Sequence, residues 1–183
     1  MAKTIHTILV ALLLVMLGTS TASAARGQPH NEVPVKGTVT GEHEVDRPPG
    51  PDGWIFTSSG TGQMSHLGRV DYSLEQASSF GPDGVISSTG TITFTAANGD
   101  ELVVAQEATS QIVGPGEGFT LEGTWTVVSG SGRFTHAMGS GSLDGVGDIP
   151  GGEALFGLPD GFAEFNLRGE IAYDASNRTN PLR

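Results

Sequence analysis

Hydrophobic and polar residues alternate along most of the chain after residue 33. In residues 33–45 the valines share one face and the charged and hydroxyl side chains share the other. The same period of two occurs in residues 62–75, 89–96, 101–112, 118–128 and 162–173, and a glycine-spaced run covers 139–145. Such alternation is typical of strands with one buried face. No sustained helical period occurs after residue 25, so we expect an all-β domain.

Turn residues separate these runs. Asn98-Gly99 lies between two alternating segments, which is a strong hairpin signal. Residues 129–132 (SGSG) predict a second turn. Residues 46–60 contain three prolines and three glycines, and we predict a long loop there; residues 146–161 predict another.

The order of seven or eight strands joined by turns is that of a meander. A meander of this length either closes into a barrel or folds into two packed sheets. Closure removes the exposed strand edges that a disulfide-free β protein must otherwise protect. We therefore predict an eight-stranded antiparallel up-and-down barrel, in a single domain over residues 34–173.

The N-terminus has the features of a targeting segment. Lys3 precedes an apolar run over residues 8–17, and Ala22-Ser23-Ala24 supplies the small residues of a cleavage site. The run is too short to span a bilayer, which favours a cleaved signal peptide (1–24) over an uncleaved anchor. We expect the mature chain to begin at Ala25, with a linker (25–33), a polar tail (174–183) and a secreted or periplasmic location.

Charge and motifs exclude several functions. The chain has 9 Lys and Arg against 20 Asp and Glu, a net charge of −11, and no basic patch. Binding to nucleic acid or, after signal cleavage, to a membrane is therefore not expected. The sequence has no cysteine and no nucleophile-elbow, zinc-protease or phosphate-loop motif. We expect no cofactor and no metal.

Three stretches together carry a family resemblance: residues 65–69 (SHLGR), residues 90–100 (GTITFTAANGD), and residues 128–134 (VSGSGRF) followed by 139–141 (GSG). They resemble bacterial exported proteins of the allene oxide cyclase barrel-like group, whose relatives include plant allene oxide cyclase and dirigent proteins. The resemblance implies an eight-stranded barrel with an apolar lumen, often a dimer or trimer. It also implies confinement of a reactive intermediate, but it assigns no active-site residue here.

Three histidines share their parity with apolar residues: His43, His66 and His136. The alternation predicts that all three point inward, where an imidazole needs a polar partner. Three readings follow: three separately hydrogen-bonded side chains, one shared polar site near a barrel mouth, or a three-histidine metal site.

Aromatic residues at inward positions suggest a ligand site. We hypothesise that Trp125, Phe94, Tyr72 and His66 line one cavity for a small apolar ligand. Small residues predicted to face inward, Gly68, Ala96 and Gly123, would leave room for it. The alternative is that the rings fill that room themselves.

Two classes of function remain open. The first is an exported barrel that binds a small apolar ligand or a partner in or around its lumen. The second is an isomerase or cyclase that acts by confining a reactive substrate. The absence of a nucleophile and of a clear acid–base pair favours the first.

Overall fold

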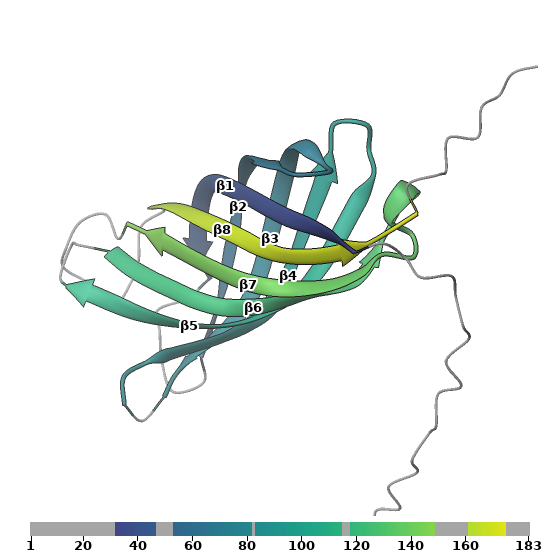
Figure 1. Cartoon of the computed structure of the whole chain (residues 1–183). Coiled ribbons are helices and arrows are strands. Elements are labelled where there is room, and N and C mark those ends of the chain that lie inside the picture. Colours follow the sequence, from purple (N-terminus) through teal and green to yellow (C-terminus); the bar gives the residue numbers. More distant parts are fainter. Residues whose placement is uncertain (1–31, 47–52, 82, 115–117, 149–160, 175–183) are drawn as a thin grey trace, which may run out of the picture.

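The computed structural model describes residues 32–46, 53–81, 83–114, 118–148 and 161–174 (Figure 1). The predicted signal peptide, most of the predicted linker and nearly all of the predicted tail lie outside these residues. The described strands are β1 (Val33–Val45), β2 (Trp54–Met64), β3 (Gly68–Phe80), β4 (Ile86–Ala96), β5 (Glu101–Gly114), β6 (Gly118–Gly130), β7 (Met138–Gly147) and β8 (Gly161–Ala172).

Each strand pairs antiparallel with the next, and β8 pairs with β1 to close a barrel (Figure 1). This confirms the predicted eight-stranded up-and-down barrel. No described helix is long and apolar enough to cross a membrane. The one described helical turn, η1 (Gly132–Phe134), is a single 3-10 turn.

The predicted loop at residues 46–60 is wrong in its second half. Strand β2 begins at Trp54, directly after Gly53, and pairs with β1 and β3 over its length. Its inward residues include Trp54, Phe56 and Ser58, all buried. The three prolines precede Gly53, so they do not interrupt the strand hydrogen bonds, although they dominate the composition of the segment.

The predicted single run over residues 62–75 is also wrong. A turn at residues 65–67 separates β2 from β3, and Met64 pairs with Gly68 across it. His66 and Gly68 have φ angles of 68° and 76°, the left-handed region that a tight turn requires. Because the turn has three residues, Met64 and Val70 still fall on the same parity, so the alternation continues across it.

The Asn98-Gly99 hairpin between β4 and β5 is confirmed. The Gly99 N–H donates to the Ala96 carbonyl at 2.8 Å, and the Ala96 N–H donates to the Asp100 carbonyl at 2.9 Å. Gly99 has a φ of 85°. This is a type I turn closed by a left-handed glycine, a common three-residue hairpin connection.

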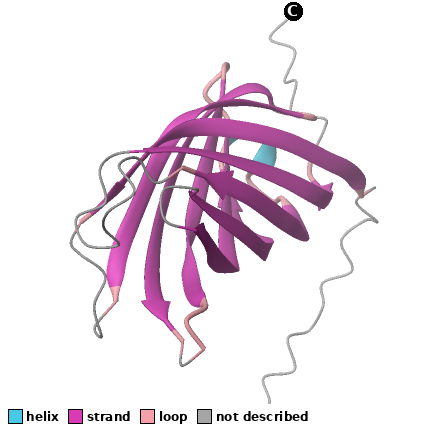
Figure 2. Ribbon diagram, turned by 90° about the vertical axis from the view of Figure 1, so that its left-hand side faces the viewer, coloured by secondary structure: helices cyan, strands magenta, loops and turns pink. Residues whose placement is uncertain are grey.

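The barrel has an end that is filled by apolar side chains, which we call the apolar end. It carries the turns at residues 65–67, 97–100 and 131–137, and Phe134 of η1 is completely buried there. Viewed from the opposite end, Figure 2 shows this helical turn, in cyan, behind the strands. Its apolar side chains are Val35, Met64, Leu67, Val70, Ala96, Leu102, Phe134 and Ile171.

Candidate binding site in the barrel interior

The other end of the barrel has buried polar side chains, and we call it the polar end. At this end the chain passes from β1 to β2, from β3 to β4, from β5 to β6 and from β7 to β8. On β1 to β5, polar side chains occupy several of the inward positions, whereas the buried side chains of β6 to β8 are apolar. The buried polar residues are His43, Ser58, Gln76, Ser78, Ser88, Gln106 and Ser110.

Two polar pairs join nearby strands on the inner surface of the barrel. The Gln106 Nε2 group donates to Gln76 Oε1 at 2.7 Å, and the hydroxyls of Ser78 and Ser88 lie 2.9 Å apart. Within the described part of the chain, the Gln106 Oε1 atom is buried and has no hydrogen-bond partner. A buried amide oxygen without a donor costs free energy, so this atom is a candidate contact for a bound molecule.

Tyr72 supplies a hydroxyl deeper in the barrel. Its OH lies 2.8 Å from the Oγ atom of Ser58, and the Ser58 hydroxyl also lies 2.9 Å from the Glu42 carbonyl oxygen. Burial raises the pKa of Tyr72 above its ordinary value, and the Ser58 hydrogen bond opposes this only partly. The phenol is therefore neutral at physiological pH, and because the Ser58 hydroxyl donates to Glu42, the Tyr72 hydroxyl donates to Ser58.

His43 is the one of the three predicted histidines that is buried. Its ring stacks on Phe56 with a centroid distance of 5.0 Å and meets the edge of Phe119 at 5.9 Å. It therefore lies among aromatic rings at the polar end.

The inward orientation predicted for His66 and His136 is wrong. Both are exposed and lie near the apolar end, because each occupies a turn and not a strand. His66 Nε2 lies 3.0 Å from the Pro34 carbonyl oxygen, and His136 Nδ1 lies 3.3 Å from a carboxylate oxygen of Asp174. His66 therefore contacts β1, and His136 contacts a residue that follows β8; neither lies near His43 at the polar end.

A metal site built on these histidines is not formed. The described residues contain no group of three or more histidine, aspartate or glutamate side chains placed to hold a metal ion.

Of the four residues predicted to line one cavity, His66 is outside and the other three are inside. Phe94 and Tyr72 lie directly opposite each other in the β3–β4 ladder, both buried. Trp125 lies on β6, and its indole extends over the wall formed by β7 and β8, where its Nε1 donates to the Ser142 carbonyl at 3.0 Å.

Glycines on that wall make room for the indole. A Cβ atom added at Gly141 or at Gly169 would lie 2.7 Å or 2.6 Å from Cζ2 of Trp125. At Gly123 an added Cβ would lie 2.7 Å from the Cβ of Ala108 on the neighbouring strand. These inward glycines therefore permit close approach of the indole or of another strand. The predicted extra room at Gly123 is not found. Gly68 is the first residue of β3, where a Cβ atom would meet no atom within 4 Å, and its φ of 76° favours glycine.

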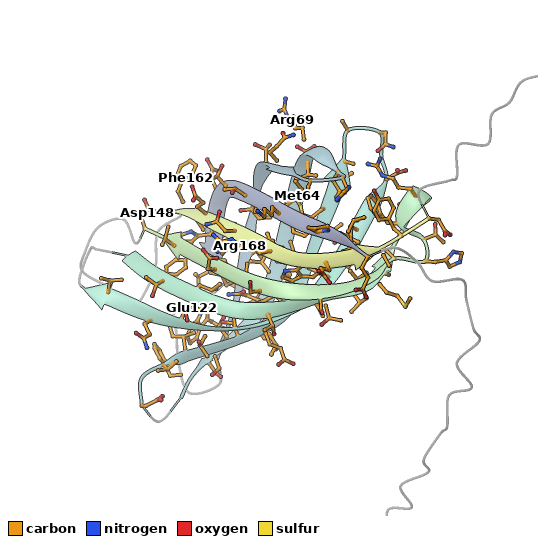
Figure 3. All side chains as sticks on the ribbon, in the orientation of Figure 1. Met64, Arg69, Glu122, Asp148, Phe162 and Arg168 are labelled. Atoms are coloured by element: carbon orange, nitrogen blue, oxygen red, sulfur yellow. The ribbon has the colours of Figure 1, made fainter. Side chains whose placement is uncertain are left out.

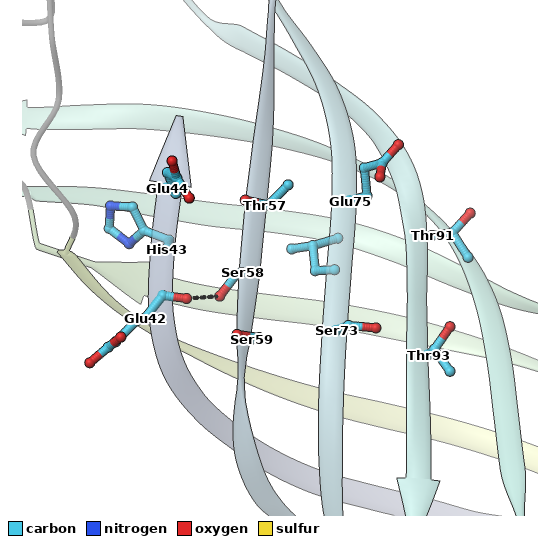
Figure 4. A pocket seen from close by; sticks show the side chains of 11 residues that line it. Glu42, His43, Glu44, Thr57, Ser58, Ser59, Ser73, Glu75, Thr91 and Thr93 are labelled. Carbon is cyan, nitrogen blue, oxygen red and sulfur yellow. Dashed lines mark hydrogen bonds between the residues drawn. The ribbon is translucent and has the colours of Figure 1, made fainter. Parts of the chain in front are cut away.

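The outer surface has a groove that the sequence did not reveal. It has a volume of about 650 Å³ and crosses β1 to β4 (Figure 4). Its exposed lining consists of hydroxyls and three carboxylates, those of Glu42, Glu44 and Glu75. Such a lining suits a polar or cationic group. Figure 3 shows other side chains on the outer surface, among them Arg69, Glu122 and the exposed Phe162.

No protein-family model matches the chain, and no curated protein sequence matches it. Among solved structures, the chain is similar to the pterocarpan synthase dirigent protein GePTS1, with 14% sequence identity and a TM-score of 0.44. The similarity covers 78% of this chain and 87% of that protein. The activity in the name belongs to that protein.

Proposed function

We propose that this protein is an exported barrel that binds a small, largely apolar molecule inside its polar end. The observation that carries this proposal is the buried Oε1 atom of Gln106, which has no hydrogen-bond partner among the described residues. A polar group of a bound molecule would satisfy it. The apolar residues of β6 to β8 would receive the rest of that molecule.

The distribution of polar residues supports the same function. An interior that only stabilises the fold is best filled with well-packed apolar side chains, as the apolar end is. Buried polar groups lower stability unless every one of them is hydrogen-bonded. Their restriction to five neighbouring strands at one end, opposite an apolar wall, is the arrangement common in small-molecule sites.

Two tryptophans offer a direct test. Trp54 is buried at the start of β2, at the polar end, and its ring lies 5.1 Å from that of Phe80; Trp125 lies further along the barrel. Trp54→Phe and Trp125→Phe each leave one reporter. We expect the neutral dye Nile red to bind with a blue-shifted emission and to change the fluorescence of both reporters. A dye that leaves both reporters unchanged would contradict the proposal.

A second candidate is conversion of the bound molecule, as an isomerase or cyclase. The specific observation in its favour is the buried neutral hydroxyl of Tyr72, which would give a bound substrate the proton that it donates to Ser58 in the structure. The molecule that copurifies with the protein can be identified by native mass spectrometry and then incubated with fresh protein. Conversion by the wild type that Tyr72→Phe abolishes, while binding persists, would establish this activity.

Export is part of the proposal and rests on residues 1–24. We expect N-terminal sequencing of exported protein to begin at Ala25. A first residue of Met1 would contradict it.

A further inference from the structure

We propose that the Gln76–Gln106 amide pair binds a hydroxyl group, so that the barrel selects apolar alcohols over apolar molecules of equal size without an O–H. This inference rests on the proposed function and names the chemical class of its ligand.

The pair is held in place. Gln76 on β3 and Gln106 on β5 both lie opposite Gly90 of β4, one on each side of it. Because glycine has no side chain, the two amides meet across β4, at 2.7 Å. An added Cβ at Gly90 would lie 2.5 Å from the Cβ of Gln76. The glycine is therefore what allows this contact between strands that are not neighbours.

The free atom of the pair is an acceptor. Gln106 is only 3% exposed, and its Nε2 group donates to Gln76 Oε1. Its Oε1 atom has no hydrogen-bond partner in the described residues. A ligand hydroxyl would donate to it. If both amides turned over together, the free group would be an N–H donor, and a hydroxyl would accept from it. A hydroxyl satisfies the pair in either orientation, whereas an ether oxygen satisfies it only in the second orientation, because it can only accept.

Charge argues against an anionic ligand group. The buried polar residues among those described include no lysine or arginine, and the chain has a net charge of −11. A carboxylate would therefore lose its hydration without gaining a cationic partner. A neutral hydroxyl avoids this cost.

The ladder places an apolar surface next to the pair. Trp125 lies opposite Gln106 in the β5–β6 ladder, and Gly141 and Gly169 continue the row. A ligand whose hydroxyl meets Gln106 would have its hydrocarbon part near the β6–β8 wall.

Two isomers make the test. 1-Octanol and heptyl methyl ether have the same formula, and the affinity of each can be measured by displacement of Nile red from the full exported protein. We expect the wild type to bind the alcohol about tenfold or more tightly, since in the amide orientation of the structure the ether leaves the buried Gln106 Oε1 acceptor unpaired. In Gln106→Met we expect this preference to fall to about one.

Gln111→Met is the matched control, because Gln111 is on the same strand but exposed. It should keep the wild-type preference. Equal binding of the two isomers by the wild type, as expected if a water molecule occupies the site, would overturn the inference while leaving the proposed function intact. A preference that survives in Gln106→Met would also overturn it. The wild-type ratio decides the question even if that variant does not fold.

Failure of the proposed function has a different signature. In that case Nile red does not bind, or neither isomer displaces it.

Discussion

The two ends of the barrel interior differ in what fills them. At the apolar end, Phe134 is fully buried and packs against Tyr173 with a centroid distance of 5.1 Å. The Arg133 guanidinium lies over the Phe134 ring, 4.9 Å from its centroid. At the polar end, the inward positions of β1 to β5 hold serines, glutamines and His43. The same eight strands therefore close one end with hydrophobic packing and equip the other with hydrogen-bonding groups.

The two ends contribute differently to the stability of the fold. Apolar burial contributes about 25 cal/mol per Å² removed from water, so the apolar end stabilises the fold. The polar groups contribute little net stability even when paired, and an unpaired one opposes folding. This cost is the reason that the proposed function places a ligand at the polar end.

The largest expected effect is at the apolar end. Phe134→Ala should lower the free energy of unfolding by about 3–5 kcal/mol, because it leaves a cavity beneath the turn that fills this end. Urea denaturation would measure it. The control is Phe162→Ala, since Phe162 is 61% exposed, and it should change stability by less than about 0.5 kcal/mol. Equal effects of the two variants would contradict the comparison.

A smaller loss is expected on the wall that carries Trp125. Gly169→Ala should cost about 3 kcal/mol, because the added methyl group would overlap both Trp125 and the backbone of β7. Combining it with Trp125→Phe should cost less than the sum of the two single changes, since the smaller ring relieves part of the overlap. Strict additivity in thermal denaturation would show that the indole does not pack on Gly169.

The polar pair should behave differently. Gln76→Leu should cost about 2 kcal/mol, because it removes the acceptor of the buried Gln106 amide. Replacing both glutamines by leucine should restore most of that stability, since no unpaired amide remains. A double-mutant cycle by urea denaturation checks this. A double variant less stable than Gln76→Leu would show that the pair is kept for stability.

The smallest effect concerns pH. Burial raises the pKa of Tyr72 above its ordinary value of 10.0. Between pH 10.0 and this higher pKa, the folded protein therefore holds a proton that the unfolded chain has lost. Stability should therefore be constant with respect to this group below about pH 10 and fall as the pH rises above it. Tyr72→Phe should flatten that decline in unfolding experiments at pH 9 to 11. An unchanged slope would contradict it.

Most of the barrel could be predicted from local alternation. The inward parity predicted for Tyr72, Phe94 and Trp125 is confirmed, since successive side chains of a strand point to opposite faces. The same rule failed for His66, because its three-residue turn keeps the parity of the flanking strands. It failed for His136 because that parity was taken from Phe134, which lies in the 3-10 turn, and from Met138, which is exposed. Alternation alone does not reveal such a turn.

The candidate site was only partly accessible to sequence reasoning. Gln106 and Ser110 stand at the inward parity of a run that includes Leu102 and Val104. Polar residues at apolar positions are a signal that could have marked the polar end. The contribution of β2 was hidden, because proline and glycine dominate the composition of the segment before it.

The sequence by itself determined most of the strands, the hairpin at Gly99 and the face on which the side chains within those strands lie, because these depend on interactions between residues close in the chain. The tertiary structure decided which side chains meet. Gln76 and Gln106 are separated by 30 positions and by one strand, and their contact depends on barrel closure, on the register of β3, β4 and β5, and on a glycine between them. Register is set by packing over the whole interior, so no local pattern contains it.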